Sequence, residues 1–453
     1  MLVDPQSPVE SPGWWFQKLL PELVARRRSY DVLDAYYRGD PPLPWGPENC
    51  KDVFRKFQRK ARLNLASVIV EAVRHRQVPL GFRTGADGDE YGDDAAWGIW
   101  QGNDFDAEWK VLNRAKLSMG DAYTIVGPPS DDGIPTISAE DPRQVITASE
   151  PGNRRRARVG LKVFKDEWTA ELHAYLYLPG VVYRLRHAEI PDGVLWPVSD
   201  WSWVDDGQSL PLQVVPVVHF GNRVDLFGRS LGEFEDVIDS LDRVNLMLLQ
   251  RMTVAVMQAF RQRAVKGNLP ETDATGDAID WGSIFTADPG AVWSLPAGVD
   301  LWESGGVDLT PLLESVKADV RDILATTSTP LFYMFPDAAN GSAEGASLQR
   351  ESLVFKTQDR NDETSDPIEQ TMALAFQFAG DVERGSRRDM EVIWAPPERF
   401  SLAERSSAAT QAGAAGVPWE TVMAEFFQFT PQQVARMAAQ RANDVLLLPP
   451  AGS

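Results

Sequence analysis

The sequence predicts a protein of the α+β class that is divided into several domains. Its 453 residues exceed the roughly 250–300 at which a single hydrophobic core stops growing. Apolar residues recur at helical spacing as far as Gly120, and from Ala122 to Phe220 they alternate with polar residues at a period of two. Helical spacing returns after Ser230. A β-rich region is therefore expected between two helical regions.

Four helices are expected in the first region. Trp15, Leu19 and Leu23 belong to an apolar stripe that continues to Tyr37 and ends before Gly39. Three further amphipathic segments predict helices over 65–73, 93–101 and 104–118, ended by Pro79 and by Gly120.

The β-rich region predicts an antiparallel meander. Short runs of β-branched, aromatic and aliphatic residues are separated there by Gly, Pro and Asp. The expected strands are Tyr123–Val126, Thr136–Ser138, Val145–Ala148, Val159–Phe164, Trp168–Leu178, Val181–Arg186 and Val214–Phe220.

A long helix is expected after the sheet. Ser230 and Glu233 match a Ser-x-x-Glu capping box, and no Gly or Pro occurs from Glu233 to Lys266, which allows about 30 helical residues and about 45 Å. On a helical wheel the apolar residues of its first half share one side. Four carboxylates lie on the opposite side, namely Glu235, Asp236, Asp239 and Asp242. The first half of this helix therefore has an apolar face and an acidic face.

The remaining chain predicts a projection followed by helices. Residues 261–306 are rich in Gly, Pro and Asp, with β-like pieces at Ser283–Thr286 and Ala291–Ser294. Thr310 is expected to cap a helix that has Pro311 at its first position and ends at Thr329-Pro330.

A loop and a further group of helices complete the chain. The loop Ser328–Gly345 carries an apolar run, Leu331–Phe335, that a solvated loop would avoid. A third long helix is expected from Ala346 to Gly380, with a restart or kink at Asp366-Pro367. Short helices are expected over 401–413, 418–428 and 431–443, and capping boxes (Ser401 with Glu404, Thr430 with Gln433) begin the first and last.

The charge balance argues against a protein that binds nucleic acid over its whole surface. Forty-five Lys and Arg stand against 65 Asp and Glu, for a net charge of −20. Three local basic clusters could bind DNA or pair with acidic surfaces of a neighbouring subunit. For each cluster taken singly, a solvent-exposed face that makes weak ion pairs is the favoured interpretation. The clusters are Arg26–Arg28, then Arg55, Lys56, Arg59, Lys60 and Arg62, then Arg154–Arg156.

The sequence shows no sign of secretion or of a membrane span. Cys50 is the only cysteine, which excludes an intramolecular disulfide and fits a reducing compartment. No signal peptide is visible, and the longest apolar stretch, Leu246–Met257, is interrupted by Gln250 and Arg251. No membrane partner is expected.

The catalytic motifs are weak. Gly228-Arg229-Ser230-Leu231-Gly232 matches the Gly-x-Ser-x-Gly elbow of serine hydrolases, but all four histidines (His75, His173, His187 and His219) precede Ser230, whereas that fold has its histidine after the serine. The helix-cap reading of Ser230 is therefore preferred. No Gly-Lys and no Gly-x-Gly occurs, so a nucleotide-binding P-loop is absent. The acidic stretch 87–94 fits a solvated loop better than a cation site. No enzyme activity, cofactor or metal site is expected.

The order and spacing of several short strings carry a family resemblance. The strings are Leu33-Asp34-x-Tyr36-Tyr37-x-Gly39, Asn64 before the helix leading to Gly81-Phe82-Arg83, Asn103-x-Phe105-Asp106, Gly120-x-Ala122-Tyr123, Pro216-Val217-Val218-x-Phe220-x-Asn222, Gly228-Arg229-Ser230, and Thr329-Pro330 followed by Asn340-x-Ser342-Ala343-Glu344. In this order the chain resembles the portal (head-to-tail connector) proteins of long-tailed double-stranded DNA phages.

The resemblance implies a subunit that assembles into a ring of twelve. Its parts would be a mixed wing over 1–228, a stem helix over 229–260, a clip projection over 261–306, a second stem helix over 307–327, a tunnel loop over 328–345, a long kinked wing helix and return over 346–397, and a helical crown and tail over 398–453.

The resemblance also implies a function. The ring would form the channel at the capsid vertex through which double-stranded DNA is packaged and ejected. The four acidic residues of the first stem helix would either line this channel or meet a basic surface of an adjacent subunit. Asp337, Asn340 and Ser342 of the tunnel loop would lie nearest the DNA.

Its implied partners are components of the phage particle and its packaging machinery. Trp281, Phe285 and Trp293 of the clip would dock the terminase large subunit or the head-completion adaptor, and the ring would also meet the major capsid and scaffolding proteins. The protein would occupy the virion, and the host cytoplasm during assembly. Two alternatives remain open: a serine hydrolase using Ser230, and a virion assembly protein without a channel.

Overall fold

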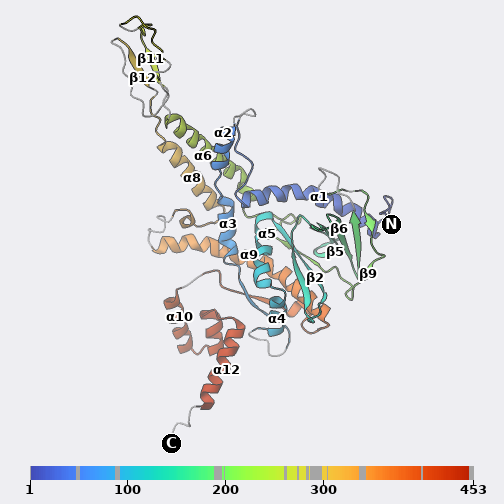
Figure 1. The fold of residues 1–453 in the computed structure, drawn as a ribbon. Coiled ribbons are helices and arrows are strands. Elements are labelled where there is room, and N and C mark those ends of the chain that lie inside the picture. Colours follow the sequence, from blue (N-terminus) through green and yellow to red (C-terminus); the bar gives the residue numbers. More distant parts are fainter. Residues whose placement is uncertain are drawn as a thin grey trace. The chain divides into compact units, whose positions relative to one another are not determined.

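The computed structural model describes residues 2–46, 52–86, 92–187, 196–197, 199–259, 263–272, 275–281, 285, 298–303, 305–335, 343–398 and 401–447. The chain divides into two compact units (Figure 1). Unit 1 contains Met1–Arg38, Leu65–Asp236 and Thr327–Ser453, and unit 2 contains Gly39–Asn64 and Val237–Thr326. Each unit therefore combines segments that are far apart in the sequence.

The N-terminal helices of unit 1 form where the apolar spacing predicts them. They are α1 (Pro12–Tyr37), α3 (Leu65–Arg74), α4 (Asp94–Gly102) and α5 (Phe105–Met119). The Ser11 side chain caps α1 by accepting a hydrogen bond from the Trp14 backbone N–H, and the Asp93 carboxylate caps α4 by accepting from two backbone N–H groups. The apolar face of α1, which includes Phe16 and Leu20, packs on the larger sheet around Trp201.

Two antiparallel sheets confirm the predicted meander. In the larger one, β4 (Val145–Glu150), β5 (Asn153–Lys165), β6 (Leu172–Leu178), β7 (Val181–His187) and β8 (Ser202–Trp203) pair in sequence order, and β9 (Gln208–Ser209) also pairs with β7. The smaller sheet has the order β10-β2-β3, formed by Val217–Gly221, Asp121–Pro129 and Pro135–Glu140. The predicted strand Trp168–Leu178 begins only at Leu172, because Trp168 lies exposed in the preceding turn.

The long helix α9 (Ala343–Ala379) supplies the core of unit 1. It continues through Pro367, so the helix does not restart at Asp366-Pro367, and the alternative prediction of a kink there stays a prediction. Its buried face, including Met372 and Phe376, packs with Phe82 and Trp100 in one hydrophobic cluster. Beside this cluster β1 (Pro79–Arg83) pairs with β13 (Glu391–Trp394), a contact that the sequence does not predict because no local signal joins the two strands.

Short helices follow in the C-terminal segment. They are α10 (Leu402–Ala414), α11 (Trp419–Thr421) with a π-helical turn over Val422–Phe426, and α12 (Pro431–Leu447). The capping box of Ser401 with Glu404 is confirmed, since each side chain bonds the backbone N–H of the other residue. Thr430 and Gln433 make the same pair of bonds.

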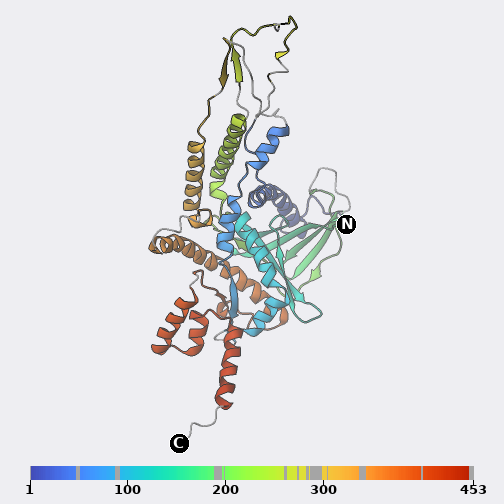
Figure 2. The same ribbon diagram turned by 60° about the vertical axis from the view of Figure 1, so that its left-hand side comes forward.

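Among its described residues, unit 2 contains three helices and a two-stranded sheet. They are α2 (Asp52–Lys60), α6 (Ile238–Ala259) and α8 (Thr310–Thr326), with β11 (Arg263–Lys266) antiparallel to β12 (Asp300–Glu303). Both ribbon views show α6 between α8 and α2 (Figures 1 and 2).

The long helix predicted from Glu233 to Lys266 is wrong at both ends. A 3-10 turn, Glu235–Val237, precedes α6, and Arg263–Lys266 is a strand whose Val265 pairs with Leu301. Thr310 is the first residue of α8 rather than its cap, and its N–H donates to Asp308 Oδ1 at 2.9 Å. No helix in the described ranges is both long and apolar enough to cross a bilayer.

Candidate functional site

The structure separates the four predicted acidic residues into two groups. Glu235 Oε1 lies 3.1 Å from an Arg229 guanidinium nitrogen, and Glu235 Oε2 accepts from the Gly232 N–H at 3.0 Å. Asp236 pairs with Arg223. Both carboxylates thus have partners within unit 1, and both precede α6 rather than lying on it.

Asp239 and Asp242 form the second group, exposed on the first turns of α6. They lie three residues apart and so share one side of the helix. The apolar residues expected on the other side, such as Leu241 and Val244, are buried. The amphipathic division predicted for this helix is therefore present, over a shorter length.

Helices α6 and α8 pack together in unit 2. The Arg243 guanidinium binds Asp319 Oδ1 at 3.0 and 3.2 Å, and the Gln258 amide donates to the Val307 carbonyl oxygen. Val320 and Ile323 of α8 are buried on the apolar side of the pair. The pair therefore keeps its apolar residues inside and leaves charged residues on its surface.

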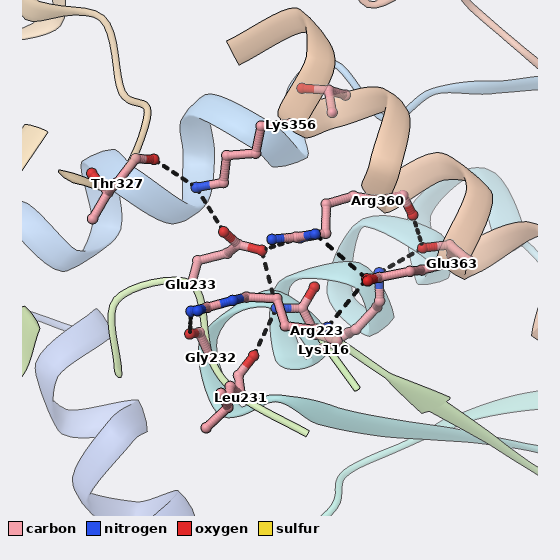
Figure 3. Close-up of polar contacts among 12 residues, drawn as sticks. Lys116, Arg223, Leu231, Gly232, Glu233, Thr327, Lys356, Arg360 and Glu363 are labelled. Atoms are coloured by element: carbon pink, nitrogen blue, oxygen red, sulfur yellow. Dashed lines mark hydrogen bonds and ion pairs between the residues drawn. The ribbon is translucent and has the colours of Figure 1, made fainter. Parts of the chain in front are cut away.

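A second cluster, buried in unit 1, was missed by the sequence reasoning. Glu233 was assigned to a capping box with Ser230, but its carboxylate is only 1% exposed and binds α9 instead. Oε2 lies 2.6 Å from Lys356 Nζ, and Oε1 accepts from Arg360 Nε at 2.6 Å and from Asn222 Nδ2 at 3.0 Å (Figure 3). Burial would raise the pKa of Glu233, but the charges of Lys356 and Arg360 outweigh it and lower this pKa to about 2.

Lys116 extends this cluster into α5. The side chain is completely buried, and Nζ donates to Thr364 Oγ1 at 2.5 Å (Figure 3). Burial lowers the pKa of Lys116 to about 8, while the charge of Glu363 acts in the opposite direction. The Glu363 carboxylate also accepts from the Arg223 backbone N–H at 3.1 Å. We call Lys116, Glu233, Lys356 and Arg360 the buried ion network, and Glu363 lies at its exposed edge.

The buried ion network holds both segments that join the units. Glu233 lies shortly before Asp236, where the chain leaves unit 1, and Thr327 is the first residue after it returns. Lys356 Nζ binds Glu233 and also donates to the Thr327 carbonyl oxygen at 2.9 Å. Lys356 of α9 therefore fixes Glu233, a few residues before α6, and Thr327, directly after α8, to the same helix.

Ser230 is neither a helix cap nor an activated nucleophile. Its Oγ is buried beside the Asp121 carboxylate, whose pKa it helps to lower, and it makes no hydrogen bond to a histidine in the described part of the chain. The fold does bring a histidine near it from earlier in the sequence, since a Cβ added to Gly221 would lie 2.9 Å from Ser230 Oγ and 3.1 Å from His219 Cε1.

That histidine is engaged elsewhere. His219 Nε2 lies 2.5 Å from Asp121 Oδ1, and the Tyr30 hydroxyl donates to Asp121 Oδ2 at 2.7 Å. Burial would raise the pKa of Asp121, but these two bonds hold it below its ordinary value. A hydrolase triad needs the serine bonded to the histidine, and this bond is not made.

The remaining predicted site residues are only partly described. Trp281 and Phe285 stack with ring centroids 5.3 Å apart, and Trp281 Nε1 donates to the Pro270 carbonyl oxygen at 2.8 Å. Trp293, Asp337, Asn340 and Ser342 lie outside the described residues, as do the β-like piece Ala291–Ser294 and most of Ser283–Thr286.

The acidic stretch 87–94 is also only partly described. Residues 87–91 fall outside the described ranges, and Asp93, besides capping α4, binds Arg384 Nε at 2.7 Å. In the ranges that the structure covers, no three His, Cys, Asp or Glu side chains gather in a way that could hold a metal ion.

Solved structures and one family model are similar to this chain, and no curated protein matches it. One structure is titled "Neck of native GTA particle computed with C12 symmetry"; it is 14% identical, covers 87% of this chain and 98% of its own, and gives a TM-score of 0.43. Another is titled "Virion of native gene transfer agent (GTA) particle", with 13% identity, 90% and 99% coverage and a TM-score of 0.42. The family model described as "Phage portal protein, SPP1 Gp6-like" matches residues 17–445. The chain therefore belongs to the SPP1 Gp6-like family of phage portal proteins and has a portal function.

Proposed function

We propose that copies of this chain form a ring, of twelve subunits as in the proteins it resembles, at the capsid vertex. Its central channel passes double-stranded DNA during packaging and ejection. Membership of the portal family supports this proposal. The observation that carries it furthest is the α6–α8 pair, two packed helices joined by a β-stranded projection, with apolar residues inside and acidic residues exposed.

The parts of the subunit follow the boundaries implied by the resemblance. The wing is 1–228, the stem helices are 229–260 and 307–327, and the clip between them is 261–306. The tunnel loop is 328–345, the long wing helix and its return are 346–397, and the crown and tail are 398–453. The bounds of α6, α8 and α9 fall within or close to these ranges.

The channel wall is acidic in this proposal. Asp239 and Asp242 repel phosphates and oppose the counterion release that binds DNA to basic grooves. Glu235 and Asp236 contribute less, because Arg229 and Arg223 offset their charges. Asp337, Asn340 and Ser342 of the tunnel loop come nearest the DNA.

The partners in this proposal use the clip and the outer wing. The aromatic residues Trp281, Phe285 and Trp293 dock the terminase large subunit and later the head-completion adaptor. The terminase supplies the energy of packaging, since the portal itself performs no catalysis. The wing contacts the major capsid and scaffolding proteins during assembly in the host cytoplasm, and the finished ring stays in the virion.

Imaging of the purified protein tests this function. Negative-stain electron microscopy, with the mass measured by light scattering, is expected to show rings with a central hole. A compact monomer at all concentrations would overturn the proposal. A closed assembly without a central hole would instead support a virion protein that has no channel.

A further inference from the structure

Helix α2 in unit 2 carries a basic face that has no acidic partner among the described residues. Arg55, Lys56, Arg59 and Lys60 are exposed, and none lies within ion-pair distance of a described carboxylate. At 100° per residue they occupy an arc of about 140°. The opposite arc is the inner side of the helix, where Gln58 is buried and its amide donates to the Pro44 carbonyl oxygen at 2.7 Å.

The stability of α2 does not account for this face. Cations near the C-terminal end of a helix interact favourably with its dipole. This interaction explains Arg59 and Lys60, which lie in the last turn. Arg55 and Lys56 lie in the first half of the helix, where that interaction is absent or unfavourable. In a chain of net charge −20, four clustered cations without a described partner indicate a contact with something acidic.

Helix α9 in unit 1 carries a complementary face. Glu351, Phe355, Asp359 and Asp362 are exposed and follow one another at helical spacing, on the side opposite the buried residues Leu353 and Thr357. Phe355 is 57% exposed. The three carboxylates make no ion pair within the described ranges. We call these four residues the α9 acidic stripe.

The next turn of α9 shows what this side of the helix binds. Asp366 continues the stripe, and its carboxylate is held by Arg155 at 2.6 Å and by Arg387 at 3.2 Å. Two arginines of the same chain thus pair with Asp366, whereas the carboxylates of the α9 acidic stripe have no such partner among the described residues. The unpaired part, from Glu351 to Asp362, is about 16 Å long, close to the roughly 13 Å of the nine-residue α2.

We propose that the basic face of α2 docks on the α9 acidic stripe of a second copy of this chain. The cations pair with Glu351, Asp359 and Asp362, while the aliphatic stems of the Lys and Arg side chains cover Phe355. Because every copy carries a charge of −20, contacts between copies need local attraction to overcome the overall repulsion. The contact joins two different surfaces, so it is head-to-tail, and it builds a closed ring when the rotation between successive copies closes. This inference rests on the ring of the proposed function.

Charge reversal tests the contact. Arg59→Glu with Lys60→Glu is expected to convert rings into monomers or short oligomers in 150 mM salt, and so is Asp359→Lys with Asp362→Lys. The combined four-residue variant, which exchanges the two charges, is expected to restore rings. Arg28→Glu with Lys165→Glu is the matched control, since both residues are exposed and the change in net charge is the same. Far-UV circular dichroism of each variant checks that the chain is folded.

The outcomes separate this inference from the proposed function. If the unaltered chain forms no ring, the proposed function fails, and this inference fails with it. If the unaltered chain forms rings and both reversals leave them intact, only the α2 contact is wrong. If Arg59→Glu with Lys60→Glu leaves the rings intact but weakens a salt-dependent binding of DNA, the basic face of α2 binds DNA. That result would overturn the contact between copies. The contact between copies would also be overturned if each double variant disrupts the rings and the combined four-residue variant does not restore them.

Discussion

The carboxylate of Glu233 lies 2.6 Å from the ammonium group of Lys356, and both side chains are almost entirely removed from water. The pair joins a residue just before the chain enters unit 2 to the middle of the long helix of unit 1. A buried ion pair is weak evidence for net stability, but removal of one partner leaves a charge buried without compensation. The buried ion network is therefore expected to be sensitive to the loss of any one of its charges.

Replacement of Glu233 by Gln is expected to reduce the free energy of unfolding by about 3–5 kcal/mol, because Lys356 and Arg360 lose their common anion. Urea denaturation followed by circular dichroism measures the change. Glu150→Gln is the matched control, since Glu150 pairs with Arg156 at the surface and its loss costs about 0–1 kcal/mol. Equal effects of the two substitutions would contradict the assignment.

The loss of unfolding free energy at acid pH is expected to depend on Glu233. Its pKa is about 2 in the folded chain and 4.5 as the ordinary value, so the unfolded chain takes up this proton first. The contribution of Glu233 is complete above pH 4.5 and is lost as the pH falls toward 2. Urea midpoints measured between pH 6 and pH 3 should fall more steeply for the unaltered chain than for Glu233→Gln. If the urea midpoints of the two proteins fall in parallel with pH, the Glu233 carboxyl does not control the loss of stability in acid.

Lys116 is expected to act at the alkaline end. Its pKa is about 8 in the folded chain against 10.5 ordinarily, so between these values the unfolded chain binds more protons and stability rises with pH. Lys116→Met, which keeps the length of the side chain without the charge, should remove this rise. Unfolding midpoints at pH 7.5, 8.5 and 9.5 measure it. A rise of the same size in the variant would assign it to another group.

Reversal of the exposed α6 carboxylates is expected to make the ring retain DNA. Asp239→Lys with Asp242→Lys replaces repulsion of phosphate by attraction, so DNA binding should appear at low salt and weaken steeply as salt increases. Filter binding of linear duplex DNA at 50 and 200 mM salt is the measurement. Asp131→Lys with Asp132→Lys, in an exposed turn, is the control. Equal retention by the two variants would mean that these positions do not line the channel.

Ser230→Ala is expected to be nearly neutral. The hydroxyl caps no helix, and the Asp121 carboxylate beside it keeps its bonds to His219 and Tyr30, so removal of the hydroxyl costs little. Rings should form as before, with a melting temperature close to that of the unaltered chain. By contrast, Ser401→Ala removes an observed N-cap and should cost about 1 kcal/mol. Esterase activity that disappears in Ser230→Ala would support the hydrolase alternative.

Local signals predicted much of the fold. The apolar stripe of α1, the alternation in β4 to β7 and the capping boxes at Ser401 and Thr430 all depend on neighbouring residues, and all are confirmed. The prediction of a capping box at Ser230 is wrong, because the glutamate of this Ser-x-x-Glu string binds side chains of α9 and not the backbone of Ser230. Glu233 reaches Lys356 and Arg360, which are close only after folding.

The candidate site was predicted less completely for the same reason. Helical spacing identified the acidic positions Asp239 and Asp242, but it also included Glu235 and Asp236, whose arginine partners are set by the turn before α6. The argument from chain order addressed only the serine-hydrolase arrangement, and nothing in it indicated that pairing of β10 with β2 brings His219 close to Ser230. Contacts between distant segments leave no periodic signal in either case.

The pairing of β1 with β13 has a consequence for synthesis of the chain. Residues Pro79–Arg83 have no ladder partner until Glu391–Trp394 leaves the ribosome, and the core around Phe82 waits for Met372 and Phe376 of α9. At about 5–20 residues per second, this delay is roughly fifteen seconds to a minute. The nascent N-terminal half therefore cannot complete its own domain, and the capacity to assemble appears only once translation is nearly finished.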